Sequence, residues 1–199
     1  MLRELGPMTG RGTFLGEIQE IGRRAREQIG EGPVTQNYRG RVEDAIALLN
    51  HAVATEIVCV LRYKFHAVWA TGLANKAVKQ EFVRHAKEEE AHVDWLAERI
   101  SQLGGRPDLN PDAVGARAAS EYEEGSDLID MIRESLVVER IAIETYREMV
   151  RYFGDGDPTT RVLLERILAQ EKGHANDMRD LLVTLRAERS AWPASPMCP

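Results

Sequence analysis

The sequence predicts an all-α protein, a four-helix bundle with a long crossover connection between its second and third helices. Long stretches with apolar residues at spacings of three and four recur along the chain, and glycine or proline separates them. No stretch shows the alternation of a β-strand. The links within each pair of helices are short and the link between the pairs is long, an order typical of two helical hairpins joined by a crossover.

Each expected helix has its own start or stop signals. Gly72 ends the first helix, and Gly104 with Gly105 ends the second. Asp157 and Pro158 are the N-cap and first residue of the fourth helix. The connection over 105–125 contains Pro107 and Pro111 and reads as a loop. The expected helices span about 41–71, 74–103, 127–153 and 158–185.

These signals divide the chain into three parts. Residues 1–38 form an N-terminal arm with a short helix over about 16–29 and a turn at Gly30, Gly32 and Pro33. Residues 39–186 form the helical bundle. Residues 187–199 form a flexible tail rich in proline.

Composition excludes several classes of protein. The net charge of −6 argues against a general nucleic-acid binder and favours cations as partners. The two cysteines, Cys59 and Cys198, provide no disulfide framework, so a reducing cytoplasm is the expected location. The N-terminus lacks the unbroken apolar core of a signal peptide, and no run approaches the roughly 18 apolar residues of a membrane span.

A glutamate interrupts the apolar stripe of every expected helix near its middle. These residues are Glu56, Glu89, Glu139 and Glu171. Burying an ionised carboxylate without a partner costs several kcal/mol, on the order of the desolvation penalty of a single ion. The pattern therefore predicts that cations lie among the four carboxylates.

The pattern also repeats. Glu89-Glu-Ala-His92 begins 33 residues after Glu56, and Glu171-Lys-Gly-His174 begins 32 residues after Glu139. Residues three apart share a helix face, so each Glu-x-x-His pair can hold one metal ion. A lone glutamate from two helices and Glu-x-x-His from two others is the ligand set of carboxylate-bridged di-iron and di-manganese bundles.

These donors suit Fe or Mn best, and Zn can also bind. Four ionised carboxylates and two divalent cations balance in charge, which makes burial tolerable. The expected arrangement assigns one ion to Glu56 and His92 and the other to Glu139 and His174. Glu89 and Glu171 bridge the two ions.

At these residues the chain resembles the bacterioferritins and the related Dps-like ferritins, from about Leu48 to Leu185. The segments that carry the resemblance are LNHAVATEIVCVLRY, EEEAHVDWLAERISQLGGRPDL, SLVVERIAIETYREMV and ILAQEKGHANDM. The resemblance implies a ferritin-like fold and a ferroxidase centre that oxidises Fe(II) with O2 or H2O2. Fe(III) would be stored in an oligomeric cage, in an iron-detoxifying and oxidative-stress role. Tyr63 matches a tyrosine beside that centre.

The sequence departs from the bacterioferritins at two places. Glu90 occupies the position of the methionine that binds haem in that family, so haem is not expected. The tail AWPASPMCP lacks the short fifth helix of the 24-subunit cages, which favours a homo-oligomer of 12 subunits. The arm contains Arg23, Arg24 and Arg26, but neighbouring glutamates favour a solvated or subunit-packing helix over DNA binding.

Two other functions remain open at this point. The same ligand set serves a di-iron peroxidase or a di-manganese catalase without iron storage. A DNA-compacting helical protein with a vestigial metal site is the non-enzymatic alternative.

Several other residues near the expected centre have more than one interpretation. His85 and Glu88 either support the centre from outside or lie on a solvated face. Tyr63 and Tyr146 can also be read as core aromatic residues whose hydroxyls find hydrogen-bond partners. Cys59 is a buried apolar residue or a redox-active one. His51 and His66 lack a paired motif and are expected to be surface or hydrogen-bonded histidines.

Overall fold

The computed structural model describes residues 14–30, 34–35, 38, 40–70 and 76–191. These residues form helices and no β-strand, so the all-α prediction is confirmed. The chain divides into two units, Met1–Gln36 and Asn37–Pro199. The six helices are α1 (Phe14–Glu27), α2 (Val42–Trp69), α3 (Lys76–Gln102), α4 (Pro111–Arg117), α5 (Leu128–Phe153) and α6 (Pro158–Ala191).

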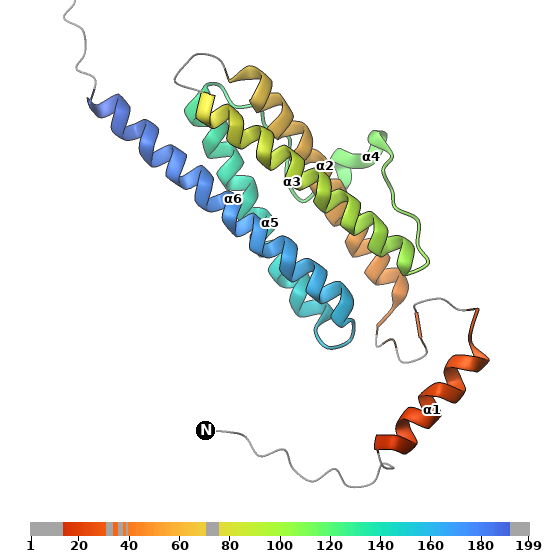
Figure 1. The fold of residues 1–199 in the computed structure, drawn as a ribbon. Helices are drawn as coiled ribbons and strands as arrows, with labels where there is room; N and C mark the ends of the chain where they lie inside the picture. Colours follow the sequence, from red (N-terminus) through yellow and green to blue (C-terminus); the bar gives the residue numbers. More distant parts are fainter. Residues whose placement is uncertain (1–13, 31–33, 36–37, 39, 71–75, 192–199) are drawn as a thin grey trace, which may run out of the picture. The chain divides into compact units, whose positions relative to one another are not determined.

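The second unit is a bundle of two helical hairpins. Helix α2 packs along α3, and α5 packs along α6 (Figure 1). The connection from α3 to α5 runs along the bundle and contains α4, which packs against α2. This is the predicted order of two hairpins joined by a long crossover.

Residues that the sequence analysis predicted to start or end helices are found at helix ends in the structure. The Asp157 carboxylate accepts a hydrogen bond from the amide of Thr160 at 2.9 Å, and Pro158 is the first residue of α6. After α3, Gly104 has a φ of 79°, a backbone conformation that glycine adopts without steric cost. The predicted stop at Gly72 and start at Ala74 lie outside the described residues.

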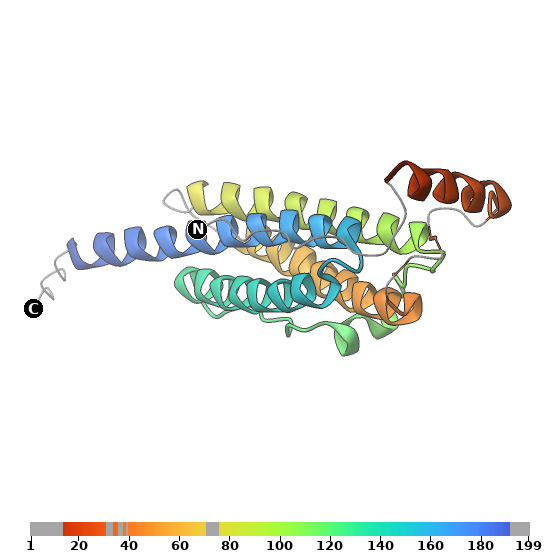
Figure 2. The same ribbon diagram turned by 90° about the horizontal axis from the view of Figure 1, so that it is seen from below.

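Two features of the helices differ from the sequence prediction. The crossover, expected to be a loop, contains α4, because the Asn110 side chain accepts from the amide of Asp112 and Val114 is buried. Helix α6 continues to Ala191, past the expected end near Leu185, because no glycine or proline interrupts it there. Its C-terminal end extends beyond the neighbouring helices (Figure 2).

The apolar stripes pack against one another along the bundle. Fully buried core residues occur on both sides of the glutamate positions in each helix. One end of the core is a cluster that includes Tyr63, Phe82, Ile132 and Met178. The helices are therefore held at fixed rotation about their axes, and that rotation determines where the polar residues of each stripe point.

The crossover is fixed to α2 by two buried polar side chains. Arg62 donates hydrogen bonds to the carbonyl of Glu121 in the crossover and to the carbonyl of Glu134 in α5. His66 contacts the carbonyl of Glu124 at 2.9 Å, and burial lowers its pKa to about 4. His66 is thus a hydrogen-bonded histidine, as expected.

Helix α2 is long and apolar enough, by length and composition, to cross a membrane, and half of its apolar window is buried inside the bundle. The sequence analysis did not single out this helix, because Asn50, His51 and Glu56 interrupt its apolar residues. Helix α2 is this apolar because it contributes alanine, valine and leucine to the core on most of its faces.

The first unit contains α1. Arg23 contacts the carboxylates of Glu20 and Glu27 at 2.6 and 2.7 Å. The charge of this arginine is thus paired within its own helix, in line with the expectation of a solvated helix.

Candidate metal centre

The four stripe glutamates and the two histidines of the repeated motif lie together inside the bundle. Each glutamate is 1% exposed, and His92 and His174 are 0% and 2% exposed. Glu56 comes from α2 and Glu139 from α5, whereas α3 and α6 each supply a Glu-x-x-His pair. Helix packing thus collects six titratable side chains at one depth of the core.

His92 lies at the centre of a first group of donors. Its Nδ1 atom is 2.8 Å from Glu89 Oε2, 3.2 Å from Glu56 Oε2 and 3.1 Å from Glu171 Oε1. These four side chains offer ligand atoms within 4.8 Å of one another. They match the ligands expected for the first ion.

His174 lies at the centre of a second group. Its Nδ1 atom is 3.2 Å from Glu89 Oε1, 3.7 Å from Glu139 Oε2 and 3.6 Å from Glu171 Oε2. Ligand atoms of these four side chains also lie within 4.8 Å of one another. They match the ligands expected for the second ion.

Glu89 and Glu171 belong to both groups. Each directs one carboxylate oxygen toward His92 and the other toward His174. Placed in this way, each of the two carboxylates has one oxygen available to either donor group.

Protons compensate the charge of these carboxylates when no cation is present. Burial, together with the charge of Glu171, raises the pKa of Glu139 to about 8. Burial and the charge of Glu56 raise the pKa of Glu89 to about 7. Burial opposes protonation of His92, but hydrogen bonds to Glu171, Glu56 and Glu89 raise its pKa to about 12. The metal-free site therefore retains protons at positions that cations would take.

Three donor atoms have close polar neighbours but no well-aligned hydrogen bond. They are Glu89 Oε1, Glu171 Oε1 and His174 Nδ1, all buried. An unsatisfied buried polar atom costs about 1–3 kcal/mol. The three orphaned atoms lie in the two donor groups, and divalent ions would satisfy them, so the residues present fit a dinuclear metal centre.

Two tyrosines contact the lone glutamates in a reciprocal pattern. The hydroxyl of Tyr63, on α2, donates to Glu139 of α5. The hydroxyl of Tyr146, on α5, donates to Glu56 of α2. Tyr63 was expected beside the centre. Tyr146 also contacts a glutamate of the centre, in addition to its place in the core.

The outer nitrogens of both histidines also have partners. His92 Nε2 is 3.2 Å from Gln170 Oε1, and His174 Nε2 is 2.7 Å from Glu88 Oε2. Such contacts fix the ring so that Nδ1 faces the centre. Glu88 thus supports the centre from outside, one of its two open interpretations. The sequence analysis missed Gln170, although Gln170 precedes Glu171 as Glu88 precedes Glu89.

The remaining candidates lie around the centre. Cys59 is buried, and burial with the charges of the nearby glutamates raises the pKa of its thiol. His51 is exposed and contacts the carbonyl of Arg117 at 3.0 Å, as expected for a surface histidine. Glu90, at the position of the family's haem ligand, forms an ion pair with Lys64.

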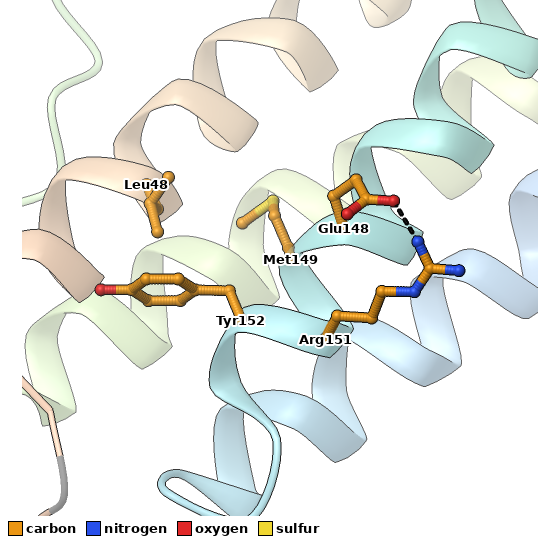
Figure 3. Close-up of a pocket in the computed structure, with 5 residues that line it drawn as sticks. All are labelled: Leu48, Glu148, Met149, Arg151 and Tyr152. Atoms are coloured by element: carbon orange, nitrogen blue, oxygen red, sulfur yellow. Dashed lines mark hydrogen bonds and ion pairs between the residues drawn. The ribbon is translucent and has the colours of Figure 1, made fainter.

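A separate groove of about 510 Å³ lies between α2 and α5 (Figure 3). It is lined by Leu48, Met149, Tyr152 and the ion-paired side chains of Glu148 and Arg151. None of the six donors lines this groove, so it is distinct from the metal centre.

A sequence profile described as a ferritin-like domain matches residues 46–187, which include all six donors. This chain belongs to the ferritin-like domain family. The resemblance to bacterioferritins and Dps-like ferritins is therefore confirmed.

Relatives of this ferritin-like chain include proteins of different named functions. A DNA protection during starvation protein of Pyrococcus furiosus is 31% identical over 144 residues, which cover 71% of this chain and 78% of the relative. A 3-demethoxyubiquinol 3-hydroxylase of Cupriavidus necator is 31% identical over 112 residues. That match covers 52% of this chain and 51% of the hydroxylase, so the chain spans about half the length of that relative.

Solved structures share the ferritin-like fold. A dodecameric thioferritin, the bacterioferritin-related protein of Bacteroides fragilis, superposes with a TM-score of 0.74 at 25% identity, covering 88% of this chain and 99% of the other. Dps from Thermosynechococcus elongatus has a TM-score of 0.67 at 22% identity, covering 70% and 90%. The second likeness shows the fold alone.

Proposed function

We propose that this ferritin-like protein is a ferroxidase that binds two Fe(II) ions as substrate and oxidises them with O2 or H2O2. The observation that carries the proposal is the pair of four-donor groups that share Glu89 and Glu171. Oxygen and imidazole donors without thiolate favour Fe or Mn, and Zn can compete. Iron fits the family membership and the two-ion geometry together.

Bound iron supplies the electrons, one from each Fe(II). With H2O2 as oxidant, two electrons and two protons convert the peroxide to two water molecules. With O2, two electrons and two protons give H2O2. The site residues bind the ions through Glu56, His92, Glu139 and His174.

The same residues also handle protons. Glu89, Glu139 and the histidines retain protons in the metal-free site, and these protons are released as the ions bind. Tyr63 and Tyr146 hold one carboxylate oxygen of Glu139 and Glu56, which keeps the remaining oxygens directed at the ions. Core packing on both sides of the site limits the access of water.

Storage of the product requires a closed shell, and we propose that this chain assembles into a homo-oligomer of 12 copies that retains Fe(III). The dodecameric thioferritin of Bacteroides fragilis supports the subunit number. The starvation-protection relative of Pyrococcus furiosus supports a role in iron detoxification and oxidative stress.

An anaerobic Fe(II) titration of the metal-free protein tests this function, followed by addition of O2 or H2O2. Particle mass and iron per chain are recorded in the same sample. We expect two Fe(II) per chain, fast oxidation, and later loading far beyond two in a large particle. The Glu144→Gln variant changes an exposed glutamate of α5 and is the control for Glu139→Gln.

Other outcomes would assign other functions. Saturation at two ions with turnover and no mineral would indicate a di-iron peroxidase, or a catalase if only Mn supports turnover. A DNA band shift that persists in Glu139→Gln, without iron oxidation in the unsubstituted protein, would indicate a DNA-compacting protein.

A further inference from the structure

The two donor groups of the metal centre are related by the repeat within the chain. Counterparts from the two hairpins occupy matching places: Glu56 and Glu139, Tyr63 and Tyr146, Glu89 and Glu171, and His92 and His174. The match fails at the residue directly before the shared glutamates, which is Glu88 in α3 and Gln170 in α6. These two residues are the outer partners of the histidines, so the partners differ in charge.

The outer hydrogen bonds of the two histidines differ in strength. His174 Nε2 is 2.7 Å from Glu88 Oε2, whereas His92 Nε2 is 3.2 Å from Gln170 Oε1. Hydrogen bonds to an ionised carboxylate are shorter than those between neutral groups and about twice as strong. A carboxylate behind a ligand histidine also raises the basicity of the nitrogen that binds the metal. Nδ1 of His174 is therefore the better electron-pair donor of the two.

Glu88 also selects the tautomer of His174 that can bind a metal ion. Binding through Nδ1 requires the proton of the neutral ring to be on Nε2. An ionised carboxylate only accepts hydrogen bonds, so Glu88 favours this proton position. The amide of Gln170 can rotate to offer an acceptor or a donor, so it supports both tautomers of His92. His174 is thus better preorganised for a metal ion than His92.

Arg84 fixes the orientation of the Glu88 carboxylate. Its Nη1 atom is 3.1 and 2.9 Å from the two oxygens of Glu88. Glu81 and Asp177 also contact this guanidinium, so three carboxylates contact one positive charge on the side of His174. Negative charge remains on this side, and it favours a cation in the neighbouring donor group.

The equivalent arginine on the side of His92 has different contacts. Arg166 is the counterpart of Arg84 in the repeat. It lies over the ring of Trp95, 3.7 Å from the centroid. Trp95 in turn packs against His92, with ring centroids 5.5 Å apart. The positive charge of Arg166 opposes the binding of a cation in the neighbouring donor group.

We propose that Glu88 makes the donor group of His174 the tighter of the two metal sites. Gln170 leaves the donor group of His92 the weaker one. The first Fe(II) then binds among Glu139, His174 and the two shared glutamates. Oxidation of a pair of ions requires both groups to be filled, so the weaker group sets the Fe(II) concentration at which paired oxidation begins. This inference rests on the proposed ferroxidase and makes Glu88 and Gln170 positioning residues of its centre.

Co(II) titration of the metal-free full-length protein tests the proposal, with calorimetry for the affinity and the visible spectrum for the geometry of the bound ion. O2 is excluded, and each donor group is measured alone. Glu56→Gln leaves the ion of the His174 group, and Glu139→Gln leaves the ion of the other group. We expect the ion in Glu56→Gln to bind about tenfold more tightly than the ion in Glu139→Gln, the lower end of the usual effect of an outer partner.

Exchange of the outer partners separates their charge from their packing. Glu88→Gln added to Glu56→Gln should weaken the remaining ion about tenfold. Gln170→Glu added to Glu139→Gln should strengthen the remaining ion about tenfold, a gain that a packing defect does not produce. An unchanged affinity after either exchange would overturn the proposal.

A control variant and a crystal soak complete the test. Glu90→Gln changes a half-exposed glutamate of α3 that pairs with Lys64, and it should alter neither affinity. Crystals of the unsubstituted protein soaked in less than one Co(II) per chain should show anomalous density among Glu139, Glu171 and His174. Density centred instead on the His92 group would overturn the proposal.

The outcomes also separate this inference from the proposed ferroxidase. Two Co(II) ions per chain, with equal affinities in Glu56→Gln and Glu139→Gln, would leave the dinuclear centre in place and overturn the role of Glu88. One Co(II) per chain, lost in Glu139→Gln and weakened by Glu88→Gln, would support that role and contradict the dinuclear ferroxidase.

Discussion

The hydroxyl of Tyr146 donates a hydrogen bond to Glu56, across the interface between the two helical hairpins. Tyr146 lies seven residues after Glu139, and Tyr63 lies seven residues after Glu56. Each tyrosine therefore contacts the lone glutamate of the other hairpin. This exchange fixes the two carboxylates that bind only one ion each in the proposed arrangement.

Tyr146→Phe should weaken the ion bound by Glu56 and His92 by about 10-fold or more, the usual effect of losing an outer hydrogen bond to a metal ligand. The ion bound by Glu139 and His174 should be unaffected. Stepwise Co(II) affinities measure this effect. Tyr152→Phe, an exposed tyrosine of α5, is the control, and equal affinities in the two variants would contradict the prediction.

Substitution of terminal and bridging glutamates should have different effects on metal stoichiometry. Glu56→Gln should lose one of the two ions of the centre, whereas Glu89→Gln should weaken both, because Glu89 belongs to both donor groups. Anaerobic Fe(II) binding per chain measures the difference. A loss of one ion in both variants would show that Glu89 does not bridge.

The stability of the metal-free protein should fall as pH rises from about 6.5 to 8, and should change little between about 5 and 6.5. Folding raises the pKa of Glu89 from 4.5 to about 7 and that of Glu139 from 4.5 to about 8. Below about 6.5 this gain is offset by His66 and His85, whose lowered pKa values in the folded state make the unfolded state bind more protons. Above 6.5 that offset ends, so the stability contributed by the two glutamates is lost as pH rises through their folded pKa values. The raised pKa of His92 acts in the same direction above its ordinary value of 6.5.

Urea unfolding of the metal-free protein at several pH values measures this trend. The lowered pKa of Glu56 contributes its full stability above 4.5 and does not oppose the trend. Metal-loaded protein should show the opposite slope, because ions bind more tightly when the ligands lose protons. A double Glu89→Gln, Glu139→Gln variant should show a flatter profile, and an unchanged slope there would contradict the assignment.

Asp157→Ala should destabilise the fold by about 3–5 kcal/mol, because it leaves a buried arginine without its counter-charge. Asp157 accepts hydrogen bonds from Arg99 at 3.1 and 3.2 Å and from the amide of Thr160 at 2.9 Å. Asp155→Ala, two residues earlier and 97% exposed, should change stability by no more than about 0.5 kcal/mol. Equal unfolding midpoints in urea would contradict the prediction.

The six donors could be predicted from the sequence because each is a polar residue within the apolar stripe of its helix. A carboxylate in an apolar stripe needs a cation, and this requirement is visible without a tertiary structure. The outer partners could not be predicted in this way. Whether Gln170 reaches His92 depends on the rotation of α6 against α3, which core packing sets.

The same limit applies to the crossover and to the contacts of His85 with Glu81 and Asp177. Helix α4 forms in part because Val114 finds a buried place against α2, a contact that no local pattern shows. Glu81 and Asp177 are 96 residues apart and look like ordinary surface charges in the sequence. Their proximity to His85 follows only from the pairing of α3 with α6.

Each donor group of the centre takes ligands from both hairpins: Glu171 joins the residues of α2 and α3, and Glu89 joins those of α5 and α6. An ion bound as proposed would therefore be a non-covalent cross-link between the two halves of the chain. Removing the ions with a chelator would leave the hairpins joined by the crossover, by side-chain packing and by hydrogen bonds such as that from Tyr146 to Glu56. Backbone amides near the donors should therefore exchange their hydrogens more slowly in metal-bound chains. The fraction of slowly exchanging amides would measure the fraction of chains that hold metal.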